Sequence, residues 1–146
     1  MKASYNRLTE ARMRELQALM AHRNFTVDPE RLNVYSHDEV SGEKYRFLPD
    51  IVLYPETTEQ IAEIMKWASK NKIPVTPRGA GTGLSGGAVP VFSGIVLSLE
   101  RMNRILEFDK ETLTITVEPG VVTDEIQKAA KTAGLLYAGD PCSSDA

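Results

Sequence analysis

The stretch that decides the fold reads Thr76-Pro77-Arg78-Gly79-Ala80-Gly81-Thr82-Gly83-Leu84-Ser85-Gly86-Gly87-Ala88, with five glycines in nine residues and no acidic side chain. Glycine permits positive φ and close backbone approach because it lacks a Cβ. Successive amides in such a loop can turn inward as a nest that offers N–H donors to an anion. Arg78 adds a fixed cation at the mouth of the loop. The stretch therefore predicts a site for a phosphate or pyrophosphate, and apolar strand-like runs on both sides argue against a flexible linker.

Two common phosphate motifs fit this stretch poorly. Gly81 to Gly86 has the glycine spacing of a Walker A loop, but Gly87-Ala88 replace the required Lys and Ser/Thr. The same residues read GxGxxG, but a dinucleotide fingerprint requires its last glycine to open a helix. Only eight residues separate Gly86 from Ile95, and they include Pro90 and Gly94. We therefore expect the loop to run directly into the next strand and to lie over its ligand as a strap.

Composition narrows the class of protein. The 146 residues suffice for one domain at most, and 42% apolar and 25% charged residues are typical of a soluble globular chain. A net charge of −3 without a basic stripe argues against nucleic acid or an anionic membrane as partner. No apolar run reaches the length of a transmembrane helix, and the N-terminus lacks a secretory pattern. The single cysteine, Cys142, favours a reducing compartment, so we expect a cytoplasmic protein.

Hydrophobic periodicity outlines the order of elements. It predicts helices over about 6–22, 58–71 and 123–133, and strands over 51–54, 73–76, 95–99, 105–108 and 113–118. Residues 28–48 are predicted to be irregular and anchored by Tyr35, Tyr45 and Phe47. Thr57 and Gln60 fit a capping box, Thr123 is the expected N-cap of the last helix, and Gly134 is placed for its C-cap. The result is a β-α-β unit whose glycine-rich loop follows a strand at its carboxyl end, where open α/β sheets bind ligands.

Other candidate sites are weaker. His37-Asp38 is read as an ordinary surface or capping pair rather than an acid–base pair. Only two histidines occur, at 22 and 37, and no cysteine lies near either, so no metal site is predicted. Residues 140–146 are of the types that favour turns, and they resemble the beginning of a further loop. We therefore expect an N-terminal fragment of a longer protein.

With these segments in order, the sequence resembles the FAD-linked oxidases of the vanillyl-alcohol-oxidase and p-cresol-methylhydroxylase type. It is most similar to the branch of the glycolate oxidase flavoprotein subunit and FAD-dependent D-lactate dehydrogenases. The resemblance covers about residues 28–146. Five blocks carry it: Pro49-Asp50-Ile51-Val52 with Pro55-Glu56-Thr57-Thr58-Glu59-Gln60-Ile61, Pro77 to Gly87, Leu97-Ser98-Leu99-Glu100-Arg101-Met102-Asn103, Val117-Glu118-Pro119-Gly120, and Asp140-Pro141-Cys142-Ser143-Ser144-Asp145-Ala146.

The resemblance implies an α+β fold, the first subdomain of an FAD-binding domain over residues 49–146. An N-terminal helix and irregular extension over 1–48 would precede it, while the second subdomain and the substrate domain would be missing. The implied cofactor contacts are Pro77, Arg78, Gly79, Ala80, Gly81, Thr82, Gly83, Leu84, Ser85, Gly86, Gly87, Pro119, Gly120, Pro141, Ser143 and Ser144. The arginine–glycine loop would wrap the FAD pyrophosphate, and Pro141, Ser143 and Ser144 would approach the flavin.

The resemblance also implies an activity, the oxidation of a small 2-hydroxy acid such as glycolate or D-lactate to the 2-oxo acid by hydride transfer to flavin. An electron-transfer flavoprotein, an iron–sulfur subunit or a quinone would accept the electrons, and partner subunits could attach the enzyme peripherally to the inner membrane. No catalytic residue is assigned, since the substrate site belongs to later sequence, and the fragment alone is expected to be inactive. Relatives that link FAD covalently carry histidine where this chain has Thr82, so the FAD is predicted to be non-covalent.

Two alternatives remain open at this stage. The chain could be a non-catalytic module that binds FAD or another phosphorylated ligand, or part of a flavin reductase of the cell-wall enolpyruvyl type. Within the FAD reading we expect Gly81 and Gly83 to need positive φ, which a β-branched residue cannot adopt cheaply. Loss of the Arg78 side chain should weaken FAD binding with little effect on folding.

Overall fold

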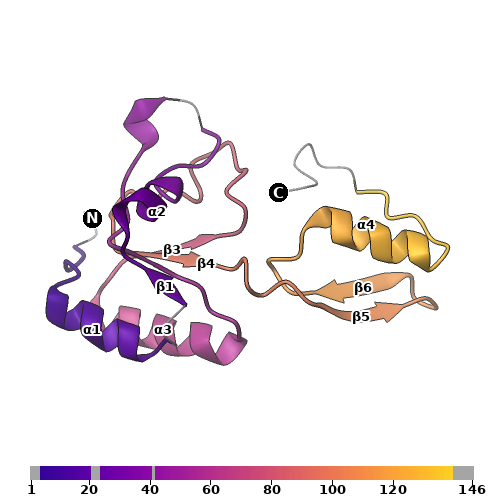
Figure 1. The fold of residues 1–146 in the computed structure, drawn as a ribbon, viewed down its shortest axis with the longest axis horizontal. Helices are drawn as coiled ribbons and strands as arrows, with labels where there is room; N and C mark the ends of the chain where they lie inside the picture. Colours follow the sequence, from indigo (N-terminus) through magenta and orange to yellow (C-terminus); the bar gives the residue numbers. More distant parts are fainter. Residues whose placement is uncertain (1–3, 21–23, 41, 140–146) are drawn as a thin grey trace.

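The structure is a computed structural model that describes residues 4–20, 24–40 and 42–139. Two units follow one another along the chain, a four-stranded sheet with helices on both faces and a two-stranded hairpin that carries one helix (Figure 1). The elements, in chain order, are α1 (Glu10–Ala18), β1 (Phe25–Thr26), α2 (Pro29–Val34), the 3₁₀ turn η1 (Glu43–Tyr45), β2 (Ile51–Leu53), α3 (Thr58–Asn71), β3 (Val75–Arg78), β4 (Ile95–Ser98), β5 (Ile105–Asp109), β6 (Thr114–Val117) and α4 (Thr123–Thr132).

The larger sheet has the strand order β1-β2-β4-β3. Strands β2, β4 and β3 are parallel, and β1 runs antiparallel to β2 at one edge. The predicted β-α-β unit is therefore present as β2-α3-β3, with β4 inserted between its two strands. Strand β3 forms the other edge, which is where a strand tolerates a residue such as Pro77 that has no N–H to donate.

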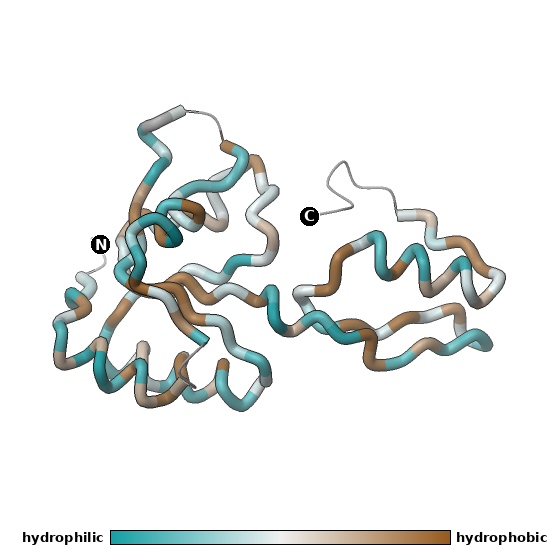
Figure 2. The backbone as a smooth tube through the Cα atoms, viewed as in Figure 1, coloured by the Kyte–Doolittle hydropathy of each residue, from teal (hydrophilic) through white to brown (hydrophobic). Residues whose placement is uncertain are grey.

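The core of this unit lies on both faces of the sheet, because side chains alternate along each strand. Ile51 and Leu53 of β2 face α1 and α3, whereas Val52 packs on the opposite side with Leu32 of α2. All residues of β2 and β4 are buried, as expected for parallel strands that are covered on both faces. Figure 2 shows the corresponding hydrophobic colour along the strands between the helices.

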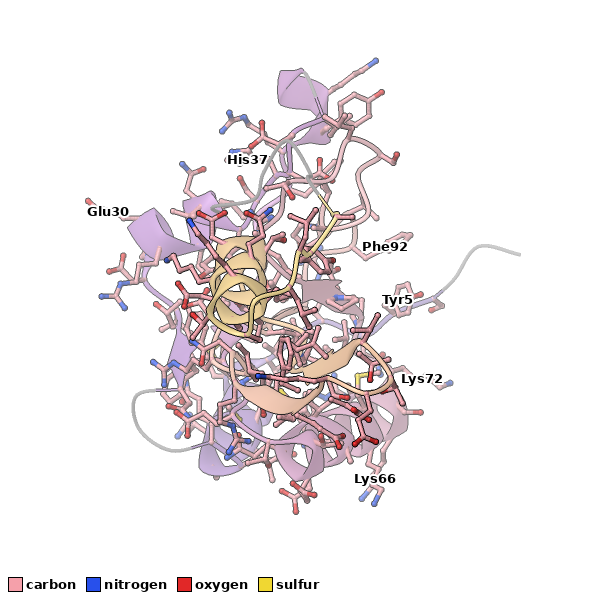
Figure 3. All side chains as sticks on the ribbon, turned by 90° about the vertical axis from the view of Figure 1, so that its right-hand side faces the viewer. Tyr5, Glu30, His37, Lys66, Lys72 and Phe92 are labelled. Atoms are coloured by element: carbon pink, nitrogen blue, oxygen red, sulfur yellow. The ribbon has the colours of Figure 1, made fainter. Side chains whose placement is uncertain are left out.

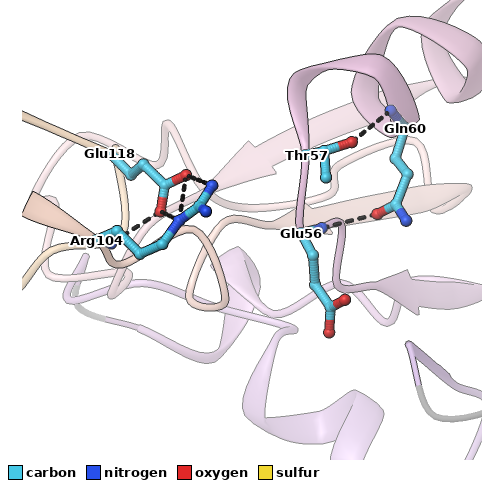
Figure 4. A network of polar contacts seen from close by, with 5 residues as sticks. All are labelled: Glu56, Thr57, Gln60, Arg104 and Glu118. Carbon is cyan, nitrogen blue, oxygen red and sulfur yellow. Dashed lines mark hydrogen bonds and ion pairs between the residues drawn. The ribbon is translucent and has the colours of Figure 1, made fainter. Parts of the chain in front are cut away.

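Helix α3 begins where the sequence predicted. The Thr57 side chain accepts a hydrogen bond from the Gln60 N–H at 3.3 Å, and Gln60 Oε1 accepts one from the Glu56 N–H at 2.8 Å (Figure 4). This is the predicted capping box with one change, because Gln60 bonds the residue before the N-cap. Helix α1 is shorter than predicted, since it begins after the Thr9 N-cap and ends at Ala18.

The hairpin β5-β6 is fastened at its open end by one ion pair. Arg104 Nη2 lies 2.6 Å from Glu118 Oε1, and the Arg104 N–H donates to Glu118 Oε2 at 2.8 Å (Figure 4). The hydrogen bonds from Arg104 lower the pKa of the Glu118 carboxyl group. Helix α4 lies along the hairpin in Figure 1, and Gly134, with a φ of +76°, directly follows its C-cap Ala133 as predicted.

Several local predictions were wrong. Residues 28–48 were expected to be irregular, but they contain α2 and η1. Thr123 is the first residue of α4 rather than its N-cap, which is Val122 and provides no side-chain hydrogen bond. Of the three expected anchors in 28–48, Tyr35 packs against the core, whereas Tyr45 and Phe47 are more than a third exposed.

The segment before residue 49 contributes to the same core. Leu16 and Met20 are buried with the apolar residues of α3, β2 and β4. The Asn6 N–H also donates to the Lys72 carbonyl at 2.9 Å. Tyr5 and Phe92 lie together at one side of the molecule, with ring centroids 5.0 Å apart (Figure 3). The domain boundary at 48/49 stays a prediction.

Candidate functional site: the glycine-rich loop and its cavity

The glycine-rich loop leaves the carboxyl end of the edge strand β3 and reaches β4 without a helix between them, as predicted. Most of the residues over 79–87 are exposed. Gly81 and Gly86 have φ values of +81° and +75°. Gly83 does not have positive φ, so the expectation for that residue was wrong. A Cβ at Gly79 or Gly87 would meet no atom within 4 Å, and the backbone there is open to a ligand.

Arg78 was predicted to be a fixed cation at the mouth of the loop, and the structure shows that its guanidinium is engaged by the protein itself. Its side chain is buried, and its Nη1 donates to the His37 carbonyl at 2.6 Å, with a longer contact of 3.4 Å from Nη2 to the Val34 carbonyl. The guanidinium carbon also lies 5.4 Å from the centre of the Tyr35 ring. Burial lowers the pKa of Arg78, while nearby acidic groups oppose this effect. Arg78 therefore joins the end of α2 to β3, and the expectation that its loss would affect folding little does not fit these contacts.

Gly81 is required by this position of Arg78. A Cβ on Gly81 would lie 2.1 Å from Arg78 Nη2 and 2.2 Å from Cζ, which is far inside van der Waals contact. The loop thus folds back over the guanidinium. The positive φ of Gly81 is a second reason, separate from this contact, why a residue with a side chain is disfavoured at this position.

Asp38 is buried next to the loop, so the expectation of a surface residue was wrong, whereas its hydrogen bond to the main chain two residues on is of the predicted capping kind. Its Oδ1 accepts a hydrogen bond from the Val40 N–H at 3.0 Å, and only 4% of the residue is exposed. The adjacent Glu39 N–H donates to the Gly83 carbonyl at 3.0 Å. The segment 37–40 therefore packs against the glycine-rich loop and is hydrogen-bonded to it.

A cavity of about 290 Å³ opens beside the start of the loop. It gathers residues from four parts of the chain: Val34, Tyr35, Arg78, Gly79, Ala80, Glu100, Asn103, Pro119, Gly120, Val121 and Val122. The structure thus brings the predicted contacts Arg78, Gly79 and Ala80 together with Pro119 and Gly120, although the two groups are about forty residues apart in sequence.

Gly120 shapes one wall of this cavity. A Cβ at this residue would lie 2.1 Å from the Leu99 carbonyl oxygen and 3.0 Å from that of Met102. The Gly120 N–H donates to the Met102 carbonyl at 2.8 Å. Only glycine allows the segment before α4 to pack this closely on the turn after β4.

One carboxylate lies on the cavity. Glu100 Oε2 accepts hydrogen bonds from the Tyr35 hydroxyl and the Ser98 hydroxyl, each at 2.9 Å. Burial raises the pKa of Tyr35, and the charge of Glu100 adds to the rise. Sequence reasoning did not select Tyr35, Glu100 or Asn103 as site residues, because the first lies in a segment read as irregular and the others resemble ordinary surface residues.

The remaining predicted contacts fall into two groups. Pro77 lies within β3, and the residues Gly81, Thr82, Gly83, Leu84, Ser85, Gly86 and Gly87 continue the loop beyond the cavity lining. Pro141, Ser143 and Ser144 lie outside the described residues. Within residues 4–20, 24–40 and 42–139 no three His, Cys, Asp or Glu side chains gather as a metal site. The helices of this part of the chain are too short or too polar to cross a membrane.

A family model described as an FAD binding domain matches residues 49–146. The chain belongs to this FAD-binding family. The glycolate oxidase subunit GlcD of Bacillus subtilis (strain 168) is 44% identical over 110 residues, which make up 75% of this chain and 23% of GlcD. The D-lactate dehydrogenase of Anaerostipes hadrus is 37% identical over 138 residues, or 94% of this chain and 28% of the enzyme. The chain thus spans about a quarter of the length of these relatives.

A solved structure of p-cresol methylhydroxylase with substrate bound superimposes with a TM-score of 0.80 at 24% identity, over 93% of this chain and 28% of the other. At this identity the likeness concerns the fold alone, and it confirms the predicted α+β class and the resemblance to the p-cresol-methylhydroxylase type. FAD as cofactor and an FAD-binding domain are likewise confirmed by the family match.

Proposed function

We propose that this chain is the diphosphate-binding part of an FAD-dependent oxidoreductase that converts a small 2-hydroxy acid to the 2-oxo acid. The relatives named for glycolate oxidation and D-lactate dehydrogenation support this substrate class. Glycolate and D-lactate share a hydroxyl group on the carbon next to a carboxylate.

The observation that carries the proposal is the cavity where Arg78, Gly79 and Ala80 meet Pro119 and Gly120. The residues fit a diphosphate, because the loop offers open main-chain N–H groups and no acidic side chain between 77 and 87. The Glu100 carboxylate, the one acidic group among the described residues that line the cavity, would repel a phosphate. We therefore assign the phosphates to the loop side of the cavity and a hydroxyl-bearing part of FAD to the Glu100 side.

When bound, FAD supplies the two-electron acceptor that takes the C2 hydrogen of the substrate as hydride. The residues of this chain bind and orient the cofactor. The hydroxyl proton goes to a base that we do not assign within this chain. The expected electron acceptor is an electron-transfer flavoprotein, an iron–sulfur subunit or a quinone, and a cytoplasmic location, with or without peripheral membrane attachment, is part of the same proposal.

We infer that the FAD is held without a covalent bond at the loop, because Thr82 has no ring nitrogen to form one. Acid precipitation of the purified protein tests this inference. Free flavin in the supernatant is the expected result, and a yellow pellet that keeps its flavin would contradict it.

Anaerobic reduction tests the proposed reaction. The full-length gene product is purified with its flavin and mixed with glycolate, D-lactate or L-lactate, and the loss of the flavin absorption band is followed. Bleaching by at least one 2-hydroxy acid, with the matching 2-oxo acid as product, is expected. A flavin that none of them reduces would favour the non-catalytic binding module, and reduction by a nicotinamide cofactor would favour the enolpyruvyl-reductase class.

A further inference from the structure

Asp38 has a buried oxygen with no hydrogen-bond donor in the part of the chain that the structure describes. Its Oδ1 is satisfied by the Val40 N–H at 3.0 Å, but its Oδ2 has none. A buried carboxylate oxygen without a donor is costly and rare in native proteins. The position therefore calls for a donor that is absent from this conformation.

The surroundings of Oδ2 limit where that donor can come from. The atom is sealed from solvent, and Asp38 is not among the residues that line the cavity, so bulk water does not reach Oδ2 and the cavity does not open onto it. The glycine-rich loop is its neighbour, since Oδ2 lies 3.7 Å from the place where a Cβ on Gly83 would stand. The loop is already bound to this segment through the 3.0 Å hydrogen bond from Glu39 to the Gly83 carbonyl.

The loop has donors to give. The N–H groups of Thr82, Gly83 and Leu84 have no acceptor among the described residues. The backbone here is irregular, and Gly83 carries no side chain that would stop a shift toward Asp38. The acceptor on Asp38 and the donors on the loop are thus neighbours, and a small movement of the loop would bring them within hydrogen-bond distance.

We propose that Asp38 is a positioning residue for the FAD loop: FAD binding moves the loop so that a main-chain N–H from residues 82–84 donates to Asp38 Oδ2. This bond fixes one side of the loop, while the other N–H groups remain directed at the diphosphate. The negative charge of Asp38 stays behind the loop, where the main chain separates it from the phosphates. The inference rests on the proposed function, because it needs FAD at the glycine-rich loop.

Amide hydrogen exchange and FAD affinity test the proposal on the full-length gene product. Asp38→Asn keeps the shape and the Oδ1 acceptor but replaces the free oxygen with an NH₂ donor. Glu39→Gln is the matched control, because that side chain is exposed and its main-chain bond to Gly83 remains. Apo-protein is prepared, and FAD binding is measured by the quenching of flavin fluorescence.

In the unaltered protein, FAD is expected to slow exchange at one or more amides of residues 82–84. Asp38→Asn should abolish this protection and weaken FAD binding about ten- to hundredfold, as expected for one lost hydrogen bond to a charged group. Its thermal midpoint without FAD should change little, because the substitution removes a buried oxygen that lacks a donor and also removes the attraction between Asp38 and Arg78, two effects of opposite sign. Glu39→Gln should match the unaltered protein in every measurement.

The outcomes separate the two hypotheses. If the unaltered protein binds no FAD, both the proposed function and this inference fail. If FAD binds but no amide in 82–84 gains protection, the inference alone is wrong, whatever the variants do. Unchanged FAD affinity in Asp38→Asn, or a loss of affinity that merely follows a lowered apo-protein midpoint, would overturn it as well.

Discussion

Replacing Gly81 with alanine should destabilise the protein through its contact with Arg78. The added Cβ would stand 2.1 Å from Arg78 Nη2, so the guanidinium must leave its place. It then loses its 2.6 Å hydrogen bond to the His37 carbonyl, which is worth about 1.5–3 kcal/mol for a charged donor. The φ of +81° adds about 1–2 kcal/mol for an L-residue. We expect a total loss of about 2.5–5 kcal/mol in the free energy of unfolding.

Urea unfolding of the chain, followed by the fluorescence of its single tryptophan, Trp67, measures this loss. Gly79→Ala is the matched control, because a Cβ there meets nothing within 4 Å and φ is not in the left-handed region. It should change the free energy of unfolding by less than about 1 kcal/mol. Equal losses for Gly79→Ala and Gly81→Ala would show that general rigidity of the loop, and not the guanidinium contact, is responsible.

A double-mutant cycle isolates the contact itself. In an Arg78→Ala background the clash is gone, so Gly81→Ala should cost only the backbone term of about 1–2 kcal/mol. The two substitutions should therefore be non-additive by about 1.5–3 kcal/mol. Additive effects would refute the claim that Gly81 is glycine because of Arg78.

Four further substitutions test the framework around the site. Thr57→Ala removes the N-cap acceptor of α3 and should lower the free energy of unfolding by about 1 kcal/mol, whereas Thr123→Ala removes no cap bond and should change it by less than about 0.5 kcal/mol in the same urea assay. The bonds from Arg104 hold the pKa of Glu118 below its usual 4.5. The ionised Glu118 therefore stabilises the folded protein above pH 4.5, and this stabilisation is lost as the pH falls through the lowered pKa. The thermal midpoints of the unaltered protein and of Glu118→Gln should consequently converge in acid. Leu16→Ala leaves a cavity at a fully buried position and should lower the free energy of unfolding by about 2–5 kcal/mol. An unchanged urea midpoint would show that α1 does not contribute to the stability of the core.

The parts of the fold that local sequence patterns encode were predicted well. Continuous apolar runs gave β2 and β4, and the capping residues Thr57 and Gln60 gave the start of α3. The absence of a helix after the loop followed from the short distance between Gly86 and Ile95. Each of these inferences used neighbours within one element, where periodicity and capping act directly.

Helix α2 could have been recognised from the two residues at its start, Asp28 and Pro29. Residues 28–48 were predicted to be irregular, but the structure uses Asp28 as an N-cap and places Pro29 at the first helical position. The Asp28 side chain accepts from the Glu30 N–H at 3.0 Å. With only six residues, the helix is too short for a 3.6-residue period to appear, so the cap was the only evidence available.

The positions of Arg78 and Asp38 could not be predicted, because they depend on contacts between distant segments. Forty-one positions separate Arg78 from its acceptor at His37. In a sequence, an arginine before a glycine run suggests a ligand contact, while a histidine–aspartate pair in a polar stretch suggests the surface. Only the folded chain shows that the two segments meet.

Helix α2 and the glycine-rich loop support each other. A helix of six residues is not stable alone in water, and its terminal carbonyl groups need donors. The Arg78 guanidinium supplies one to the Val34 carbonyl at 3.4 Å and a shorter one, at 2.6 Å, to the carbonyl of His37 just beyond the helix. In return, these carbonyls hold the guanidinium where Gly81 can fold over it. Because the Arg78 guanidinium already donates to two carbonyl groups, we propose that the main-chain N–H groups of the loop would provide most of the contacts to a bound diphosphate. The segment before residue 49 thus helps to shape the glycine-rich loop, although the family match begins only at residue 49.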